Sequence, residues 1–158
     1  MSLCIPVRVA AMAALLSFGL PAPISAANQA NQAENSGSPQ DDPAVRAALQ
    51  FVTRYEEGDL GDIYDHELTT AFKSLMARDL FLQQGGFMRV QSGGRARSRE
   101  FVGMQPFRQT PTGQTGDYRY VRFRTLHPNG LVFQDVYMDN VGGTWKVMGF
   151  YVLPAPQQ

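Results

Sequence analysis

The sequence predicts an α+β domain in which N-terminal helices pack on a four-stranded antiparallel sheet. Between Asp42 and Gln91 the apolar residues recur at helical spacing. Between Ser98 and Leu153 apolar and polar residues alternate, as is typical of strands, and glycine-rich turns divide this part into four runs. Helices followed by an antiparallel meander indicate the α+β class.

The first 27 residues have the order of a secretory signal peptide. Arg8 precedes the apolar run Val9–Leu20, and Pro21 and Pro23 come before small residues, with cleavage expected after Ala27. The alternative is a retained membrane anchor, but the apolar run is shorter than the ~20 residues that a spanning helix needs. We therefore predict an exported protein, periplasmic or secreted, without stable membrane insertion after cleavage.

The predicted mature chain contains no cysteine, because Cys4 lies in the signal peptide. This composition excludes disulfides, thiol catalysis and cysteine-containing zinc sites from the mature domain. Residues 28–41 contain no large apolar side chain, so we expect a disordered tether. Residues 42–153 then form a single domain, and residues 154–158 form a tail.

The first predicted helix has the clearest boundaries. Asp42 is a typical N-cap, Pro43 suits the first helical position, and Gly58 ends the apolar pattern. We expect two short helices next, over residues 62–68 and from Thr69 or Thr70 to Met76.

A further helix is expected over residues 78–91. Gly85 and Gly86 in its interior would each destabilise it by about 1 kcal/mol relative to alanine. A kink or a close contact between this helix and the sheet would explain them. Gly93 and Gly94 then end the helix.

The predicted strands cover residues 98–107, 118–126, 131–140 and 144–153. A two-residue turn at Gly142-Gly143 and a four-residue loop from His127 to Gly130 fix the expected pairing of the last three strands. The resulting core face is almost entirely apolar and should pack on the helices. Its residues are Val121, Phe123, Val132, Val136, Met138, Trp145, Val147 and Tyr151.

The opposite face mixes aromatic rings with charges, placing Arg122 opposite Asp135 and Lys146 opposite Asp139. Tyr, Phe, Met and Arg are enriched at protein interfaces, so this face is a candidate partner surface. The alternative is that a helix or the tether covers it. The candidate residues are Tyr118, Tyr120, Arg122, Arg124, Phe133, Asp135, Tyr137 and Phe150.

Charge is balanced overall, with 14 Lys and Arg against 14 Asp and Glu, which argues against a nucleic-acid partner. It is unevenly placed, because the helical part is acidic and the sheet part is rich in arginine. The two parts either neutralise each other or leave an anion site on the arginine side. Arg95, Arg97 and Arg99 alternate at strand spacing, which suits an anion-binding stripe or a charged edge strand.

The C-terminal strands carry a recognisable signature. Gly116-Asp117-Tyr118 opens one strand, and residues 144–152 read Thr-Trp-Lys-Val-Met-Gly-Phe-Tyr-Val. This pattern resembles the exported bacterial family called domain of unknown function 4019. The resemblance implies a curved sheet wrapped on helices, like the cystatin-like or nuclear-transport-factor-2-like cones, and it implies no activity because that family has none assigned.

Candidate chemistry is sparse, and the sequence indicates no cofactor. Tyr64, Asp65 and His66 could line an acid–base or small-ligand pocket inside a cone-shaped fold. Asp62, Asp65, His66 and Glu67 could offer metal ligands, but successive helical positions point in different directions, which favours a solvated helix face. The favoured interpretation is a binding or assembly module, with a homodimer or an envelope protein as its partner.

Overall fold

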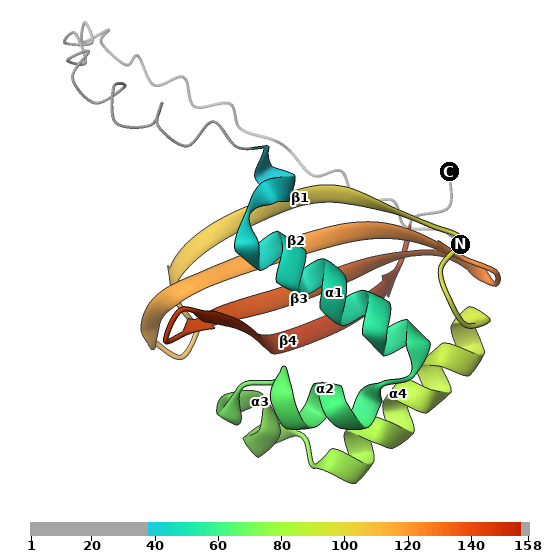
Figure 1. The fold of residues 1–158 in the computed structure, drawn as a ribbon, viewed down its shortest axis with the longest axis horizontal. Helices are drawn as coiled ribbons and strands as arrows, with labels where there is room; N and C mark the ends of the chain where they lie inside the picture. Colours follow the sequence, from blue (N-terminus) through green and yellow to red (C-terminus); the bar gives the residue numbers. More distant parts are fainter. Residues whose placement is uncertain (1–37, 156–158) are drawn as a thin grey trace, which may run out of the picture. The chain divides into compact units, whose positions relative to one another are not determined.

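The computed structural model describes residues 38–155, and the predicted signal peptide lies outside them. Within them, helices come first and a four-stranded antiparallel sheet follows (Figure 1). The last residues of the predicted tether form a short 3-10 helix rather than continuing without structure. The elements are η3 (Pro39–Asp41), α1 (Pro43–Glu57), α2 (Leu60–His66), α3 (Thr70–Leu75), α4 (Arg78–Ser92), β1 (Ser98–Gln109), β2 (Thr115–His127), β3 (Gly130–Val141) and β4 (Thr144–Pro154).

Helix α1 begins and ends where its capping residues predict. The Asp42 carboxylate accepts a hydrogen bond from the backbone N–H of Ala44 at 2.7 Å. Gly58 has φ 101°, a left-handed conformation that favours glycine, and its N–H donates to the carbonyl of Arg54. Phe51 and Val52 lie on the buried side of this helix, which crosses the sheet (Figure 1).

The remaining helices also follow the predicted order. Thr69 caps α3 by accepting a hydrogen bond from the N–H of Phe72 at 3.1 Å. Gly85 is explained by helix packing, since a Cβ there would lie 2.7 Å from a methyl group of Leu60 on α2. The expected contact between this glycine and the sheet is therefore replaced by a contact between two helices. Gly86 has open space where its Cβ would be, and no neighbour explains it.

The strands pair in the order β1-β2-β3-β4. Arg122 lies opposite Asp135 as predicted, and the pairing of β2 with β3 has no interruption. The edge of β4 is partly covered, because the N–H of Thr69 donates to Val147 and the N–H of Val147 donates to Glu67. None of the helices within residues 38–155 is both long and apolar enough to cross a membrane.

The pairing of β3 with β4 differs from the prediction along half its length. Met138 lies opposite Val147 as expected, but Tyr137 lies opposite Gly149, because a bulge at Met148 inserts one extra residue. The bulge reverses the faces of the residues that follow it. Phe150 therefore packs in the core, whereas Tyr151 lies on the opposite face and is 58% exposed.

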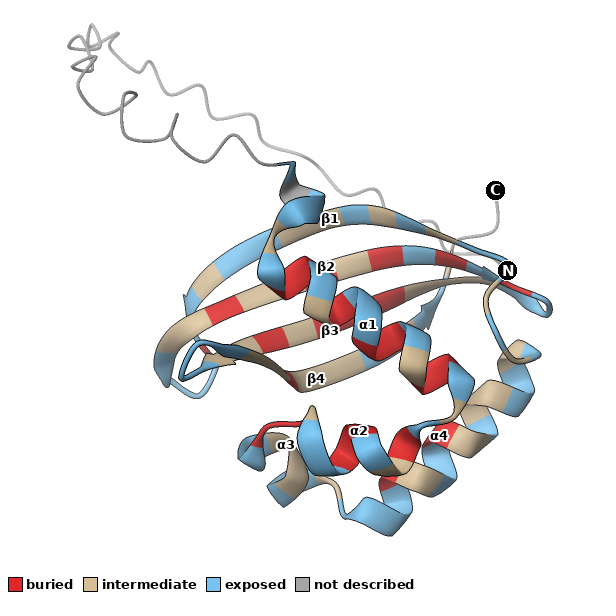
Figure 2. Ribbon diagram, viewed as in Figure 1, coloured by how far each residue is buried: buried red, intermediate tan, exposed pale blue. Residues whose placement is uncertain are grey.

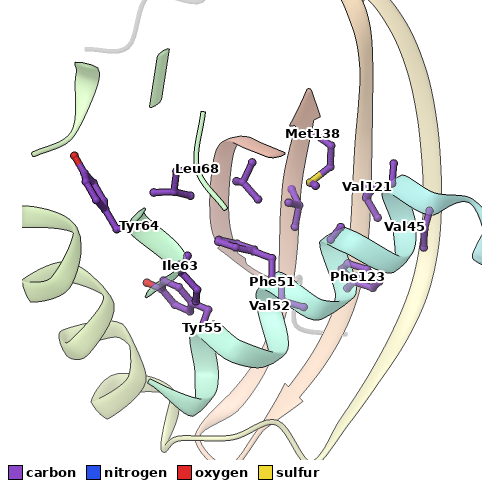
Figure 3. Packing of buried hydrophobic residues seen from close by; sticks show 14 of the residues in the cluster. Val45, Phe51, Val52, Tyr55, Ile63, Tyr64, Leu68, Val121, Phe123 and Met138 are labelled. Carbon is purple, nitrogen blue, oxygen red and sulfur yellow. The ribbon is translucent and has the colours of Figure 1, made fainter. Parts of the chain in front are cut away.

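The core lies between α1, α2 and the inner face of the sheet. Figure 2 shows its buried positions along these helices and the two central strands. Figure 3 shows the core side chains gathered between the helices and the sheet, with Phe51 and Val52 on α1 and Val121, Phe123 and Met138 on the strands. Phe51 and Phe150 meet edge to face, with ring centroids 5.1 Å apart.

Candidate functional site

Five aromatic side chains form a continuous band across all four strands on the outer face of the sheet. We call this band the aromatic face, and its residues are Phe107, Tyr118, Tyr120, Tyr137 and Tyr151. Tyr137 is its centre, because its ring centroid lies 5.1 Å from that of Tyr120, 5.9 Å from Tyr151 and 6.4 Å from Phe107. The described helices lie on the other side of the sheet, so none of them covers this band (Figure 1).

Two glycines lie against the rings, and one of them leaves no room for a side chain. Gly149 lies opposite Tyr137, and a Cβ there would touch the tyrosine side chain at 3.5 Å. A Cβ at Gly116 would lie 2.6 Å from the ring of Tyr118, which stacks on Phe107 at 5.1 Å on its other side. The Gly-Asp-Tyr sequence therefore serves the packing of the aromatic face, whereas a Cβ at Gly149 would make only an ordinary van der Waals contact.

An ion pair borders the aromatic face. The guanidinium of Arg122 donates two hydrogen bonds of 2.7 Å to the carboxylate of Asp135. Arg122 also lies over the rings of Phe133 and Tyr120, at 5.1 and 5.6 Å. Burial, together with the neighbouring Asp135, raises the pKa of Tyr120 to about 12, so its hydroxyl stays protonated at neutral pH.

The structure places seven of the eight predicted partner-surface residues on the outer face. The exception is Phe150, which the bulge turns into the core against Phe51 and Tyr55. Two of the seven, Tyr118 and Asp135, are buried by neighbours on the same face. These two side chains pack beneath their neighbours and contribute little to the exposed surface.

One further charge pair is found on this face, and one that was expected there is not. Arg124 approaches Glu100 at 3.7 Å. Asp139 and Lys146 face each other in the predicted register but do not form an ion pair.

Phe107 and Tyr151 belong to the aromatic face but were not predicted there. The loop between β1 and β2 is too irregular to fix the register of Phe107 from the sequence. Tyr151 was assigned to the core because regular alternation does not reveal a bulge.

A groove of about 510 Å³ lies at one end of the aromatic face. Its lining combines rings, prolines and amides, namely Gln105, Pro106, Phe107, Gln109, Thr110, Pro111, Tyr120 and Tyr137. The β1–β2 loop forms one side of it. The buried Thr110 holds that loop together, because its hydroxyl accepts from the N–H of Gln114 at 3.1 Å and its N–H donates to the Gln114 carbonyl.

The residues proposed for an acid–base pocket diverge. Tyr64 is buried, and its hydroxyl donates to the carbonyl of Met76 at 2.9 Å. Asp65 is exposed and pairs with Arg78, whereas His66 is exposed and lies 3.5 Å from Asp62. The three side chains do not converge on one pocket.

Two of the residues proposed as metal ligands, Asp62 and Glu67, contact an arginine instead, and Asp65 pairs with Arg78. The guanidinium of Arg54 pairs with Asp62, at 2.5 Å, and also with Asp59 and Glu67. Burial raises the pKa of Glu67, although Arg54 opposes the change. Within residues 38–155, no group of three or more acidic, histidine or cysteine side chains is arranged to hold a metal ion.

A buried polar network joins α1 to the sheet, and the sequence did not reveal it. The carboxylate of Glu56 accepts hydrogen bonds from Arg99, from the Gln134 amide at 3.0 Å and from the Ala96 N–H at 3.1 Å. Nε2 of His127 lies 3.5 Å from the same carboxylate. The side-chain carbonyl of Gln134 accepts from the Thr125 hydroxyl at 2.7 Å and from Nε of Arg99 at 3.1 Å, so the network closes on itself.

The arginines of the predicted stripe do not point the same way, because two of them pair with acidic residues of α1. Arg99 turns inward to Glu56, Arg95 pairs with the neighbouring Glu57, and Arg97 is exposed. Arg119 approaches Asp42 at 3.9 Å. The acidic helical part and the arginine-rich sheet part thus neutralise each other at these contacts.

A second hollow, of about 380 Å³, opens between the start of α1 and β1. Val45, Leu49, Phe101 and Phe123 give it apolar walls, and Arg99 is one of its polar residues. The Arg99 guanidinium already pairs with Glu56. The acidic lining residue, Glu100, lies 3.7 Å from Arg124, so the hollow is a candidate small-ligand pocket whose carboxylate already has a basic partner.

No family model, curated protein or solved structure matches this chain. The resemblance to domain of unknown function 4019 stays a prediction.

Proposed function

We propose that this protein is an exported binding module that recognises a partner protein with its aromatic face. One observation carries the proposal: a band of aromatic rings spans all four strands on the side of the sheet that the described helices leave uncovered. Aromatic and arginine side chains supply much of the binding energy at protein interfaces, and exposed apolar patches usually mark such interfaces.

The alternative, a small-ligand or acid–base pocket inside the fold, has less support. A general base must be free to reach a substrate proton. The buried carboxylate of Glu56 is instead satisfied by Arg99, Gln134 and Ala96, and the cavity beside it measures only about 20 Å³. The larger hollow of about 380 Å³ has Glu100 as its lining carboxylate, and that side chain lies 3.7 Å from Arg124. The polar groups there serve stability better than catalysis.

Native mass spectrometry of the protein isolated from its own cell envelope tests the proposal. We expect a bound second copy or another protein in the wild-type spectrum, and we expect the double variant Tyr120→Ser with Tyr137→Ser to lose it. Circular dichroism would verify that this variant stays folded.

The matched control is Leu75→Ser with Phe87→Ser, which alters two exposed apolar residues on the helical side. The control should keep the bound protein. A wild-type spectrum without any bound protein, or a double variant that retains it, would reject the proposal.

A further inference from the structure

We infer that the groove between the β1–β2 loop and Tyr137 binds an extended proline-rich segment of the partner protein. This inference rests on the proposed function, because the groove is part of the aromatic face. It names the kind of partner segment that the face would recognise.

The shape of the groove favours proline rings over a flat ligand. The ring planes of Phe107 and Tyr137 meet at 76°, and those of Tyr120 and Tyr137 meet at 46°. The rings that line the groove are therefore not coplanar. Proline-rich segments dock with their pyrrolidine rings in aromatic-lined grooves of this kind, whereas a polysaccharide would stack on coplanar rings.

The polar groups of the groove suit the backbone of such a segment. A polyproline II helix has no internal hydrogen bonds, so its carbonyl oxygens need outside donors. The amides of Gln105 and Gln109 can donate, and Gln109 makes only a long hydrogen bond of 3.4 Å within the protein. The groove therefore offers donors beside apolar rings, which is what this ligand requires.

The charge of the groove excludes strongly charged ligands. None of the side chains that line it carries a formal charge. Arg122 and Asp135, which border the aromatic face, neutralise each other, and Arg108, next to two lining residues, lies 3.5 Å from Asp117. An uncharged ligand such as a proline-rich segment matches this environment better than an acidic or basic peptide does.

The groove is also built before any ligand arrives. The buried Thr110 hydroxyl and backbone fix the loop that carries Pro111. A preformed groove and a stiff polyproline segment both lose little conformational entropy on binding.

Titration of the full chain with decaproline, followed by ¹⁵N–¹H NMR, tests this inference. We expect saturable binding with a dissociation constant below about 1 mM, with the largest shifts at the groove-lining residues Gln105, Phe107, Gln109, Thr110, Tyr120 and Tyr137. A glycine–serine peptide of the same length and cellohexaose serve as competing probes. Neither should shift these signals.

Three variants locate the binding within the aromatic face. Tyr137→Ala should weaken decaproline binding at least about ten-fold, since this ring lines the groove and pairs with both Phe107 and Tyr120. Tyr120→Phe, which keeps the ring and should fold normally, should change the affinity by less than about three-fold. The control Tyr151→Ala lies on the aromatic face but outside the groove lining, and it should bind as tightly as wild type.

Several outcomes would overturn the inference. It fails if decaproline causes no shifts, if cellohexaose shifts the groove signals instead, or if Tyr137→Ala and Tyr151→Ala weaken binding equally. The proposed function fails separately, when the envelope-derived protein carries no partner. If mass spectrometry shows a bound partner but decaproline causes no NMR shifts, the proposed binding module is supported and only the proline-rich ligand is rejected.

Discussion

Glu56 illustrates how one residue joins distant parts of this chain. Its side chain is buried, yet its carboxylate is satisfied by groups from β1, β3 and the segment before β1. Nδ1 of His127 lies 3.1 Å from the Gly94 carbonyl, which only accepts hydrogen bonds, so Nδ1 carries a hydrogen. The network therefore links the end of α4, the turn between β2 and β3, and α1.

Replacing Glu56 should be strongly destabilising. Glu56→Gln removes the negative charge that faces the buried Arg99, and leaving one partner of a buried pair alone costs about 3 kcal/mol or more. The control is Glu57→Gln, whose partner Arg95 is largely exposed, so the loss should stay below about 1 kcal/mol. Urea denaturation of both variants provides the comparison, and equal losses would contradict the role given to the network.

Two aspartates at the ends of the strands should affect stability in opposite directions. Burial, and then Asp117, raises the pKa of Asp139. Burial also disfavours the charged form of Asp117, but hydrogen bonds from Arg119 and Asn140 outweigh it and lower its pKa. At neutral pH, Asp139→Asn should therefore stabilise the protein and Asp117→Asn should destabilise it.

The sign of each pH dependence follows from these directions. A carboxyl group whose pKa is raised by folding contributes stability at low pH, and that stability is lost as the pH rises through the folded pKa. The advantage of Asp139→Asn should thus vanish when unfolding is measured below about pH 4. Asp117 behaves in the opposite way, because its stability is present at neutral pH and is lost on acidification. An Asp139→Asn variant that is less stable than wild type at pH 7 would refute this assignment.

At the scale of elements, local signals decided most boundaries. Asp42, Pro43 and Gly58 define α1 because capping and glycine conformation depend only on near neighbours. The paired strands β2 and β3 follow for the same reason, since a short turn fixes their register. The bulge at Met148 has no local signal, so sequence alternation assigned Phe150 and Tyr151 to the wrong faces.

Because of the bulge, we expect Phe150 to matter more for stability than Tyr151, which is the reverse of what regular alternation predicts. Phe150→Ala should lower the free energy of unfolding by about 3 kcal/mol, because its ring packs against Phe51 and Tyr55. Tyr151→Ala should cost much less, since that side chain is mostly exposed. Thermal or urea unfolding of the two variants distinguishes them. If Tyr151→Ala were the more harmful change, the register described for β4 would be incorrect.

At the scale of the molecule, the sequence predicted the existence of an aromatic outer face better than its extent. Tyr120 and Tyr137 could be assigned to it because both lie in a register set by one turn. Phe107 could not, because it joins the face across an irregular loop, and neither could the pairing of Glu56 with Gln134, which depends on the complete fold. Contacts between residues far apart in the chain determined both the groove and the buried network.

The outer face offers a direct comparison with the helical side. Tyr151 is 58% exposed on the aromatic face, and Phe87 is 60% exposed on α4, so the two aromatic side chains are matched in accessibility. A photoreactive benzoylphenylalanine can replace either residue without disturbing the core.

Photocrosslinking in the native cell envelope tests the central claim most directly. The binding-module account predicts a crosslinked product of defined mass when the photoreactive residue stands at position 151 and none when it stands at position 87. The absence of a product at position 151, or the same product in equal yield at both positions, would contradict it.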